Sequence, residues 1–227
     1  MLFDVIRQLS AGYQVDLWQV LAQVLSVVFV ILCILPLHEF AHGWVAYKLG
    51  DPTAKLNGRL TLNPIPHIDW VGLFLLLAVG VGWAKPVPVD PRNFKDPRKG
   101  MAITALAGPA SNFLLALLSL AVGSLLIRLW PTSRLVAYLL LFLCQLSVLN
   151  VGLGLFNLIP VPPLDGSKVL GAVLPEDKYF GYMRYERYGA LIMMVLLFTG
   201  VLDRPLAFLS DGLSDFFWLI TEAVFRL

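Results

Sequence analysis

Two histidines separated by three residues, with a glutamate directly after the first, are the part of the chain best suited to chemistry. His38, Glu39 and His42 match the pattern HExxH. On a helix, side chains four residues apart leave one face about one turn apart. Two imidazoles placed in this way can hold Zn²⁺, while the glutamate serves as a general base toward water. The pattern therefore predicts one Zn²⁺ per chain and the hydrolytic chemistry of a metalloprotease.

The surroundings of HExxH strengthen this interpretation. The motif alone is expected by chance in about one of every few hundred chains of this length. Here it directly follows residues 17–37, an apolar run long enough to cross a bilayer. Ionisable side chains beside such a run are costly and usually functional. Because two of the chain's three histidines lie in the motif, a metal site at the end of a membrane helix is favoured.

The composition is that of a polytopic membrane protein. Of the 227 residues, 58% are hydrophobic and 14% are charged, and the mean hydropathy is +0.77. These values exclude an ordinary soluble domain and predict an all-α protein in a lipid bilayer. The net charge of +2, without a basic patch, predicts no nucleic-acid partner. Cys33 and Cys144 lie within apolar runs and are interpreted as buried packing residues, not as a disulfide.

Four membrane spans are predicted from the apolar runs. They cover residues 17–37, 102–127, 135–158 and 188–202, and the first helix is expected to continue to residue 49. Pro36 is expected to kink it one turn before His38, and Gly50, Asp51 and Pro52 are expected to stop it. Residues 205–227 fit either a last span or an amphipathic surface helix.

Two shorter segments lie between the first and second spans. Residues 55–62 alternate enough to predict a short strand. Residues 70–83 are apolar but too few to cross the bilayer as a straight helix, so a re-entrant segment or a buried hairpin is predicted. We therefore expect four to six membrane segments, with a small strand or re-entrant element after the metal-binding helix. They would form a single domain over residues 1–227, with a core of about 17–175 and C-terminal helices over 176–227.

The distribution of basic residues predicts the orientation. Eight of the 17 lysines and arginines lie in residues 48–100 and four lie in residues 160–187, whereas the turn at 128–134 has two. By the positive-inside rule, the two basic segments share the cytoplasmic side. This arrangement would bring the histidine motif and the end of the third span to the same membrane face.

A third zinc ligand is needed, because catalytic zinc takes three protein ligands. Asp165 follows the third span directly, within Pro163-Leu164-Asp165-Gly166. The prolines end the helix and free the backbone to turn the carboxylate inward. The spacing leaves two roles open for Asp165, a metal ligand or a turn-capping aspartate.

Three motifs together resemble the site-2 proteases, a family of intramembrane zinc metalloproteases. They are HEFAH at 38–42, GPASN at 108–112 and NLIPVPPLDG at 157–166. The resemblance covers about residues 30–175 and is to a compact form without a PDZ or other regulatory domain. It implies that Asp165 is the third zinc ligand and that Glu39 passes a proton from water to the leaving amine.

The resemblance also implies candidate roles for polar residues near the spans. Asn157 and Asn112 are candidates to hold the substrate backbone or an oxyanion, and hydrogen bonding between helices is the alternative for both. His67 fits either a gating group near the site or a loop residue that bonds locally.

The implied activity is regulated intramembrane proteolysis of single-span membrane proteins, with an unidentified regulatory partner as a further possibility. The implied location is a prokaryotic cell membrane, with the active site toward the cytoplasm. Two alternatives remain, a metal-ion transporter and an inactive relative that binds membrane helices. Glu39→Gln distinguishes a protease from these alternatives, because in a protease this substitution should stop cleavage but leave zinc bound.

Overall fold

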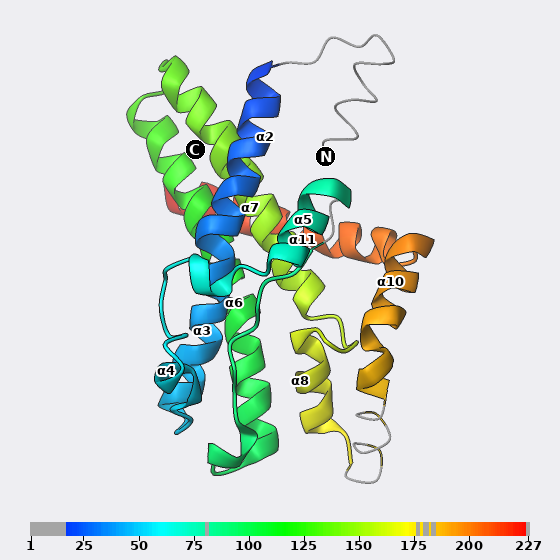
Figure 1. The fold of residues 1–227 in the computed structure, drawn as a ribbon. Helices are drawn as coiled ribbons and strands as arrows, with labels where there is room; N and C mark the ends of the chain where they lie inside the picture. The colour runs from blue at the N-terminus through cyan, green and yellow to red at the C-terminus, as the bar shows by residue number, and fades with distance from the viewer. Residues whose placement is uncertain (1–16, 80–81, 176–177, 179–181, 183–184, 226–227) are drawn as a thin grey trace.

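The computed structural model describes residues 17–79, 82–175, 178, 182 and 185–225, and all regular structure in these residues is helical (Figure 1). Three helices are apolar and long enough to cross a bilayer. They run over Val24–Lys48, Pro97–Leu129 and Arg134–Asn157, with 25, 33 and 24 residues. At about 1.5 Å per residue, each exceeds the ~30 Å hydrocarbon core of a membrane. The predicted all-α membrane protein is confirmed.

The first long helix accommodates its proline through a π-turn. Helix α2 (Leu17–Phe29) passes into the π-helix η1 (Val30–Ile34) and then into α3 (Leu35–Lys48). The Leu35 N–H bonds to the Val30 carbonyl, five residues back, and Pro36 follows directly. The wider turn bypasses a hydrogen bond that the proline cannot donate, and the helix stays continuous. The kink at Pro36 stays a prediction.

Helix α3 ends where the sequence predicted. Gly50 has φ +110°, and its N–H bonds to the Tyr47 carbonyl, while the Asp51 N–H bonds to the Ala46 carbonyl. These two bonds are those of a Schellman motif, which satisfies the last carbonyls of a helix.

The strand predicted over residues 55–62 is not present in this described part of the chain. Helix α4 (Thr53–Leu56) occupies its start, and Gly58, with φ +65°, ends that single turn. Upstream, Asp51 accepts the Thr53 N–H at 3.0 Å, and downstream Arg59 bonds to the Ala54 carbonyl. These capping contacts favour a helical turn over the alternation that suggested a strand.

The two ends of the segment predicted as re-entrant or as a buried hairpin, residues 70–83, lie side by side, as both alternatives require. Helix α5 (Trp70–Val79) follows the short helix η2 (Ile65–His67), and the chain then returns beside its own start. A Cβ placed on Gly72 would lie 2.2 Å from the Trp83 carbonyl oxygen, so these two backbones touch. The Lys85 N–H also bonds to the His67 carbonyl at 2.8 Å. Both ends of the segment therefore lie on the same side of the molecule.

The C-terminal part differs from the predicted fourth span at 188–202. After α8 (Asp165–Val173) and the short helix η4 (Tyr185–Tyr188), α10 (Gly189–Thr199) has only 11 residues. This length is about 16 Å, half a bilayer. The chain then bends by 81° into α11 (Asp203–Phe225). The two helices form at most one bent span.

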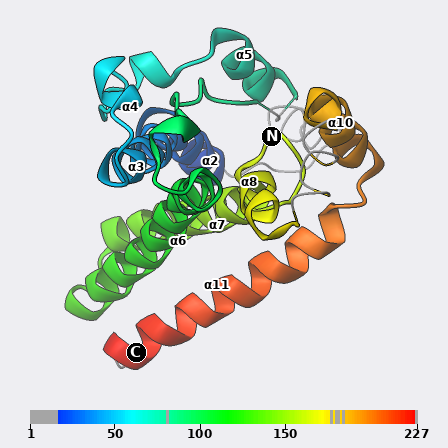
Figure 2. The same ribbon diagram turned by 90° about the horizontal axis from the view of Figure 1, so that it is seen from below.

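The core lies where α11 crosses α6 (Pro97–Leu129) and α7 (Arg134–Asn157) (Figure 2). Its buried side chains are Ala116, Leu120, Val151 and Phe217. On the outside of α6, Leu114, Leu118, Val122 and Leu125 are exposed at helical spacing, as expected of a lipid-facing stripe. Both cysteines are free. Cys33, in η1, is exposed and not buried as predicted.

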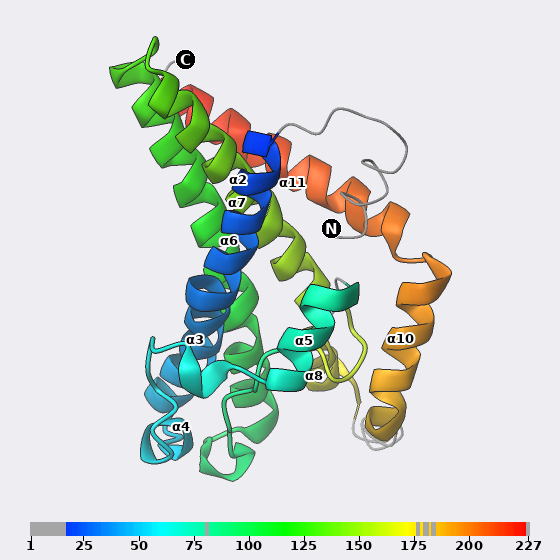
Figure 3. The same ribbon diagram turned by 45° about the horizontal axis from the view of Figure 1, so that its top comes forward.

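Large parts of the two basic segments, among the residues that the structure describes, lie at one end of the molecule. The end of α3, α4, the short helix η3 (Pro91–Asn93), the start of α6 and the end of α8 gather there (Figures 1 and 3). The turn between α6 and α7 lies at the opposite end. The shared side predicted from the charge distribution is therefore present.

Candidate metal centre

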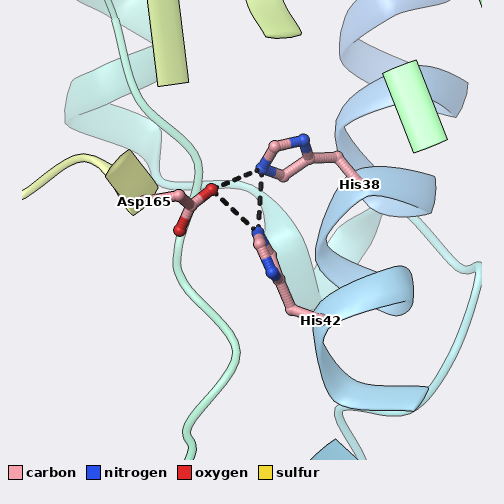
Figure 4. Close-up of side chains that lie close together, drawn as sticks. All are labelled: His38, His42 and Asp165. Atoms are coloured by element: carbon pink, nitrogen blue, oxygen red, sulfur yellow. Dashed lines mark hydrogen bonds and ion pairs between the residues drawn. The ribbon is translucent and has the colours of Figure 1, made fainter. Parts of the chain in front are cut away.

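Three buried side chains from two helices converge at the middle of the molecule (Figure 4). His38 and His42 lie on α3, and Asp165 begins α8. Asp165 Oδ2 lies 3.3 Å from His38 Nε2 and 3.0 Å from His42 Nε2, and the two Nε2 atoms are 3.0 Å apart. The three residues are 4%, 7% and 7% exposed.

The spacing and chemistry of these atoms fit a zinc ion. Tetrahedral zinc with bonds of about 2.0–2.1 Å separates its ligand atoms by about 3.3–3.4 Å, close to the distances found here. His42 Nδ1 lies 2.7 Å from the Thr104 carbonyl, which can only accept, so Nδ1 carries the proton and Nε2 has a free lone pair. Electron-rich atoms this close together need positive charge between them, which a metal ion or a proton supplies. Among the described residues, these three form the only such group of His, Cys, Asp and Glu side chains.

The start of α8 places the carboxylate. The Asp165 side chain lies in the first helical turn, where the helix dipole favours a negative charge. A Cβ on Gly166 would lie 2.1 Å from the Leu158 carbonyl oxygen, so only glycine allows α8 to begin this close to the end of α7. The second carboxylate oxygen, Oδ1, lies 3.3 Å from Lys168 Nζ. The proline-rich turn therefore brings Asp165 inward. The histidines contact Oδ2 of its carboxylate, and Lys168 contacts Oδ1.

Helix α6 packs against both histidines. The Thr104 carbonyl bonds His42, and the Asn112 amide lies 3.1 Å from His38 Nδ1. Gly108 lies between them on the same stripe. A Cβ there would be 2.3 Å from His42 Nε2 and 2.5 Å from His38 Nε2. The stripe spacing of four residues on α6 thus matches the spacing of the two histidines on α3.

Glu39 faces a different segment. Its Oε2 accepts the Val87 N–H at 2.8 Å, within the irregular chain that leads from the re-entrant segment to α6. Val87 is buried, and its neighbour Lys85 is bonded to the His67 carbonyl. One oxygen of the Glu39 carboxylate is therefore held by protein, which leaves the other for a proton-transfer partner.

The remaining predicted residues lie elsewhere. Asn112 is fully buried behind His38. Asn157 donates its amide N–H to the Leu153 carbonyl of its own helix, and no contact in the described residues joins it to the three ligands. His67 is buried, and its Nε2 bonds to the Thr61 carbonyl at 2.9 Å. This contact is local, as expected of a loop residue that bonds to its own segment.

Sequence reasoning did not identify Thr104, Lys168 or Val87. Thr104 and Val87 act through backbone groups, which leave no signal in residue type. Lys168 lies three residues after Asp165, and helical spacing alone would have suggested the pair.

Together, the bundle of membrane-length helices and the buried His-His-Asp group define a membrane metallopeptidase. Comparison with known proteins agrees. The sequence model of the family described as Peptidase family M50 matches residues 130–200, which contain Asp165. No solved structure matches the chain.

Several named zinc metalloproteases are similar to the chain. YwhC of Bacillus subtilis is 42% identical over 166 residues, which are 72% of this chain and 75% of YwhC. Rip2 of Mycolicibacterium smegmatis is 32% identical over 173 residues, 74% of this chain and 64% of Rip2. MJ0392 of Methanocaldococcus jannaschii is 29% identical over 197 residues, 85% of this chain and 48% of MJ0392. The chain belongs to peptidase family M50, the site-2 protease family, and its His-His-Asp group fits the Zn²⁺ site of a metalloprotease.

Proposed function

We propose that this protein is an intramembrane zinc metalloprotease that hydrolyses peptide bonds within or near the transmembrane helices of single-span membrane proteins. One observation carries the proposal. His38 and His42, which form a zinc-type ligand set with Asp165, lie with Glu39 in a helix that is long and apolar enough to cross the membrane. The relatives' names support the protease part, and the depth of the site supports the intramembrane part.

The depth follows from the position of the histidines along their helix. His38 lies ten residues before Lys48, where the membrane-length helix ends. Ten residues of α-helix rise about 15 Å, which is half of the hydrocarbon core. Asp165 reaches this level because α7, which runs from the opposite end of the molecule, stops there and α8 continues toward the basic end (Figure 1). A peptide bond would therefore meet the ligands inside the bilayer, at a level where soluble proteases cannot act.

Each side chain has a distinct task in this reaction. His38, His42 and Asp165 would hold the ion, and Thr104 and Lys168 keep two of these ligands oriented. When bound, Zn²⁺ supplies Lewis acidity that polarises the scissile carbonyl and makes water easier to deprotonate. Glu39 accepts the proton of the attacking water and delivers it to the leaving amine.

The proposal makes demands on the conformation of the substrate and on the orientation of the protein in the membrane. A helical substrate hides its carbonyls in hydrogen bonds, so the scissile segment must be unwound before it reaches Glu39. The basic residues gathered at one end of the molecule support a cytoplasmic location for that end. The bacterial and archaeal relatives support a prokaryotic cell membrane.

The test compares purified wild type with Glu39→Gln on a model single-span substrate, together with metal analysis. Glu222→Gln is the matched control, because Glu222 is exposed on α11. We expect zinc in all three proteins. Cleavage should be normal in the control and reduced about 10²–10⁴-fold in Glu39→Gln, the contribution typical of a general base. Wild-type cleavage rates in Glu39→Gln, or a folded wild type that binds no zinc, would contradict the proposal.

A further inference from the structure

We propose that Asn112 is a positioning residue whose amide oxygen accepts the Nδ1–H of His38 and thereby keeps the His38 Nε2 lone pair directed at the metal. This inference rests on the proposed zinc-dependent function. Of the two roles considered from the sequence, it favours hydrogen bonding between helices over a substrate or oxyanion contact, and it gives that bond a task at the metal.

The location of Asn112 separates it from substrate. Its side chain is fully buried, with 0% of the residue exposed. It touches Nδ1 of His38, whereas Nε2 of the same ring lies 3.3 Å from Asp165 and 3.0 Å from His42. The ring therefore stands between Asn112 and the ligand atoms. A group behind the ring can set the position of the ring proton but cannot reach a peptide at the ion.

The two histidines are supported in the same way. The Thr104 carbonyl can only accept, so it fixes the proton of His42 on Nδ1. For both Nε2 atoms to bind one cation, His38 needs an acceptor at its Nδ1 as well. Asn112 is the side chain that lies there, two helical turns beyond Thr104 on the same stripe of α6. Metal-bound histidines commonly donate their second ring N–H to such an acceptor.

The orientation of the amide follows from this requirement. With the amide nitrogen at 3.1 Å from Nδ1, an N–H donor faces the ring, and the amide oxygen is buried with no hydrogen-bond partner. That arrangement would place the ring proton on Nε2, where it would displace the ion. Oxygen and nitrogen of an amide are exchanged by a half-turn of the side chain. The exchanged orientation gives the oxygen a donor, the His38 Nδ1–H, and leaves Nε2 free for the metal.

The test measures zinc affinity by chelator competition in detergent-purified protein, and the absorption spectrum of the Co²⁺-loaded form. Asn112→Leu removes the acceptor, whereas Asn112→Asp keeps one in the same place. Asn150→Leu is the matched control, because Asn150 is also fully buried in a membrane-length helix but its amide N–H donates to the Leu146 carbonyl of its own helix. Thermal unfolding of the metal-free proteins reports on the fold.

We expect Asn112→Leu to weaken zinc binding about 10–100-fold, the usual effect of losing a partner behind a ligand, and to shift the Co²⁺ spectrum. Asn112→Asp and Asn150→Leu should keep near-wild-type affinity and spectra. Wild-type affinity in Asn112→Leu would overturn the proposal. A ~10–100-fold loss of zinc affinity in Asn112→Asp would also overturn it. The aspartate variant still tests the proposal if the leucine variant does not fold. A wild type that binds zinc but cleaves nothing would refute the proposed function and leave this inference standing.

Discussion

Gly108→Ala is the substitution that most directly tests the geometry of the metal centre. Gly108 lies in the middle of α6 and faces both histidines. Alanine favours a helix by about 1 kcal/mol over glycine, so helix propensity alone predicts a more stable protein. The structure predicts the opposite for metal binding.

The displacement can be worked out from the contacts. The new Cβ would lie 2.3 Å from His42 Nε2 and 2.5 Å from His38 Nε2, whereas real Cβ contacts essentially never fall below 3.0 Å. Both ligand nitrogens must therefore retreat by at least about half an ångström. A metal site tolerates about ±0.2 Å in its ligand distances. Because two ligands move together, zinc affinity should fall by more than the ~10–100-fold typical of losing a supporting partner.

Chelator competition measures the affinity, and cleavage should fall with zinc occupancy. The matched control is Gly152→Ala on α7, where an added Cβ meets no atom within 4 Å. This control should bind zinc normally and be at least as stable as wild type. If Gly108→Ala bound zinc like wild type, the close packing of α6 against the two histidines would be refuted.

Three further predictions concern other parts of the site and its support. Chelation should abolish cleavage and lower the unfolding temperature, because the ion joins α3 to α8, and added zinc should restore both; unchanged stability would argue against a bridging ion. Arg98 donates to the carbonyls of Gly171 and Leu174 at the end of α8, so Arg98→Met should loosen α8 and raise the zinc dissociation constant, whereas Arg98→Lys should partly restore it. Burial raises the pKa of Asp51, but hydrogen bonds from Thr53, Asn93 and the Asp90 N–H outweigh it and hold that pKa below its usual value. A depressed folded pKa stabilises the protein above the unfolded pKa of about 3.9, so the stability lost in Asp51→Asn should be full at pH 6 and shrink below pH 4 in thermal unfolding.

The sequence was most informative where function is encoded in a short stretch. The four-residue spacing in HExxH is sufficient to bring His38 and His42 to one face, because a helix converts that spacing into proximity without help from the rest of the fold. The end of α3 was equally local, because Gly50 supplies a positive φ at the C-terminus of the helix. Asp165 required the family resemblance, since spacing alone left it as ligand or cap.

The remaining features depend on how helices cross. The positions of Thr104, Gly108 and Asn112 against the histidines follow from the packing of α6 against α3, which no local pattern encodes. The strand prediction over 55–62 was wrong because Asp51 and Gly58 cap a helical turn, and capping contacts outweighed a weak alternation. The bend after Thr199 was missed because hydropathy records only that a run is apolar, whereas Gly200, with φ +66°, ends the helix.

The division of the ligands between α3 and α8 has a consequence for biosynthesis. Asp165 follows His42 by more than half the length of the chain, and α6 and α7 lie between them. A growing chain that has inserted its first helix has the HExxH residues but not the carboxylate. Even with α6 and α7 in place, it has only two protein ligands until the ribosome has passed residue 165. Zinc-dependent peptide hydrolysis therefore cannot begin before the core has been threaded into the bilayer, and synthesis itself delays the onset of activity.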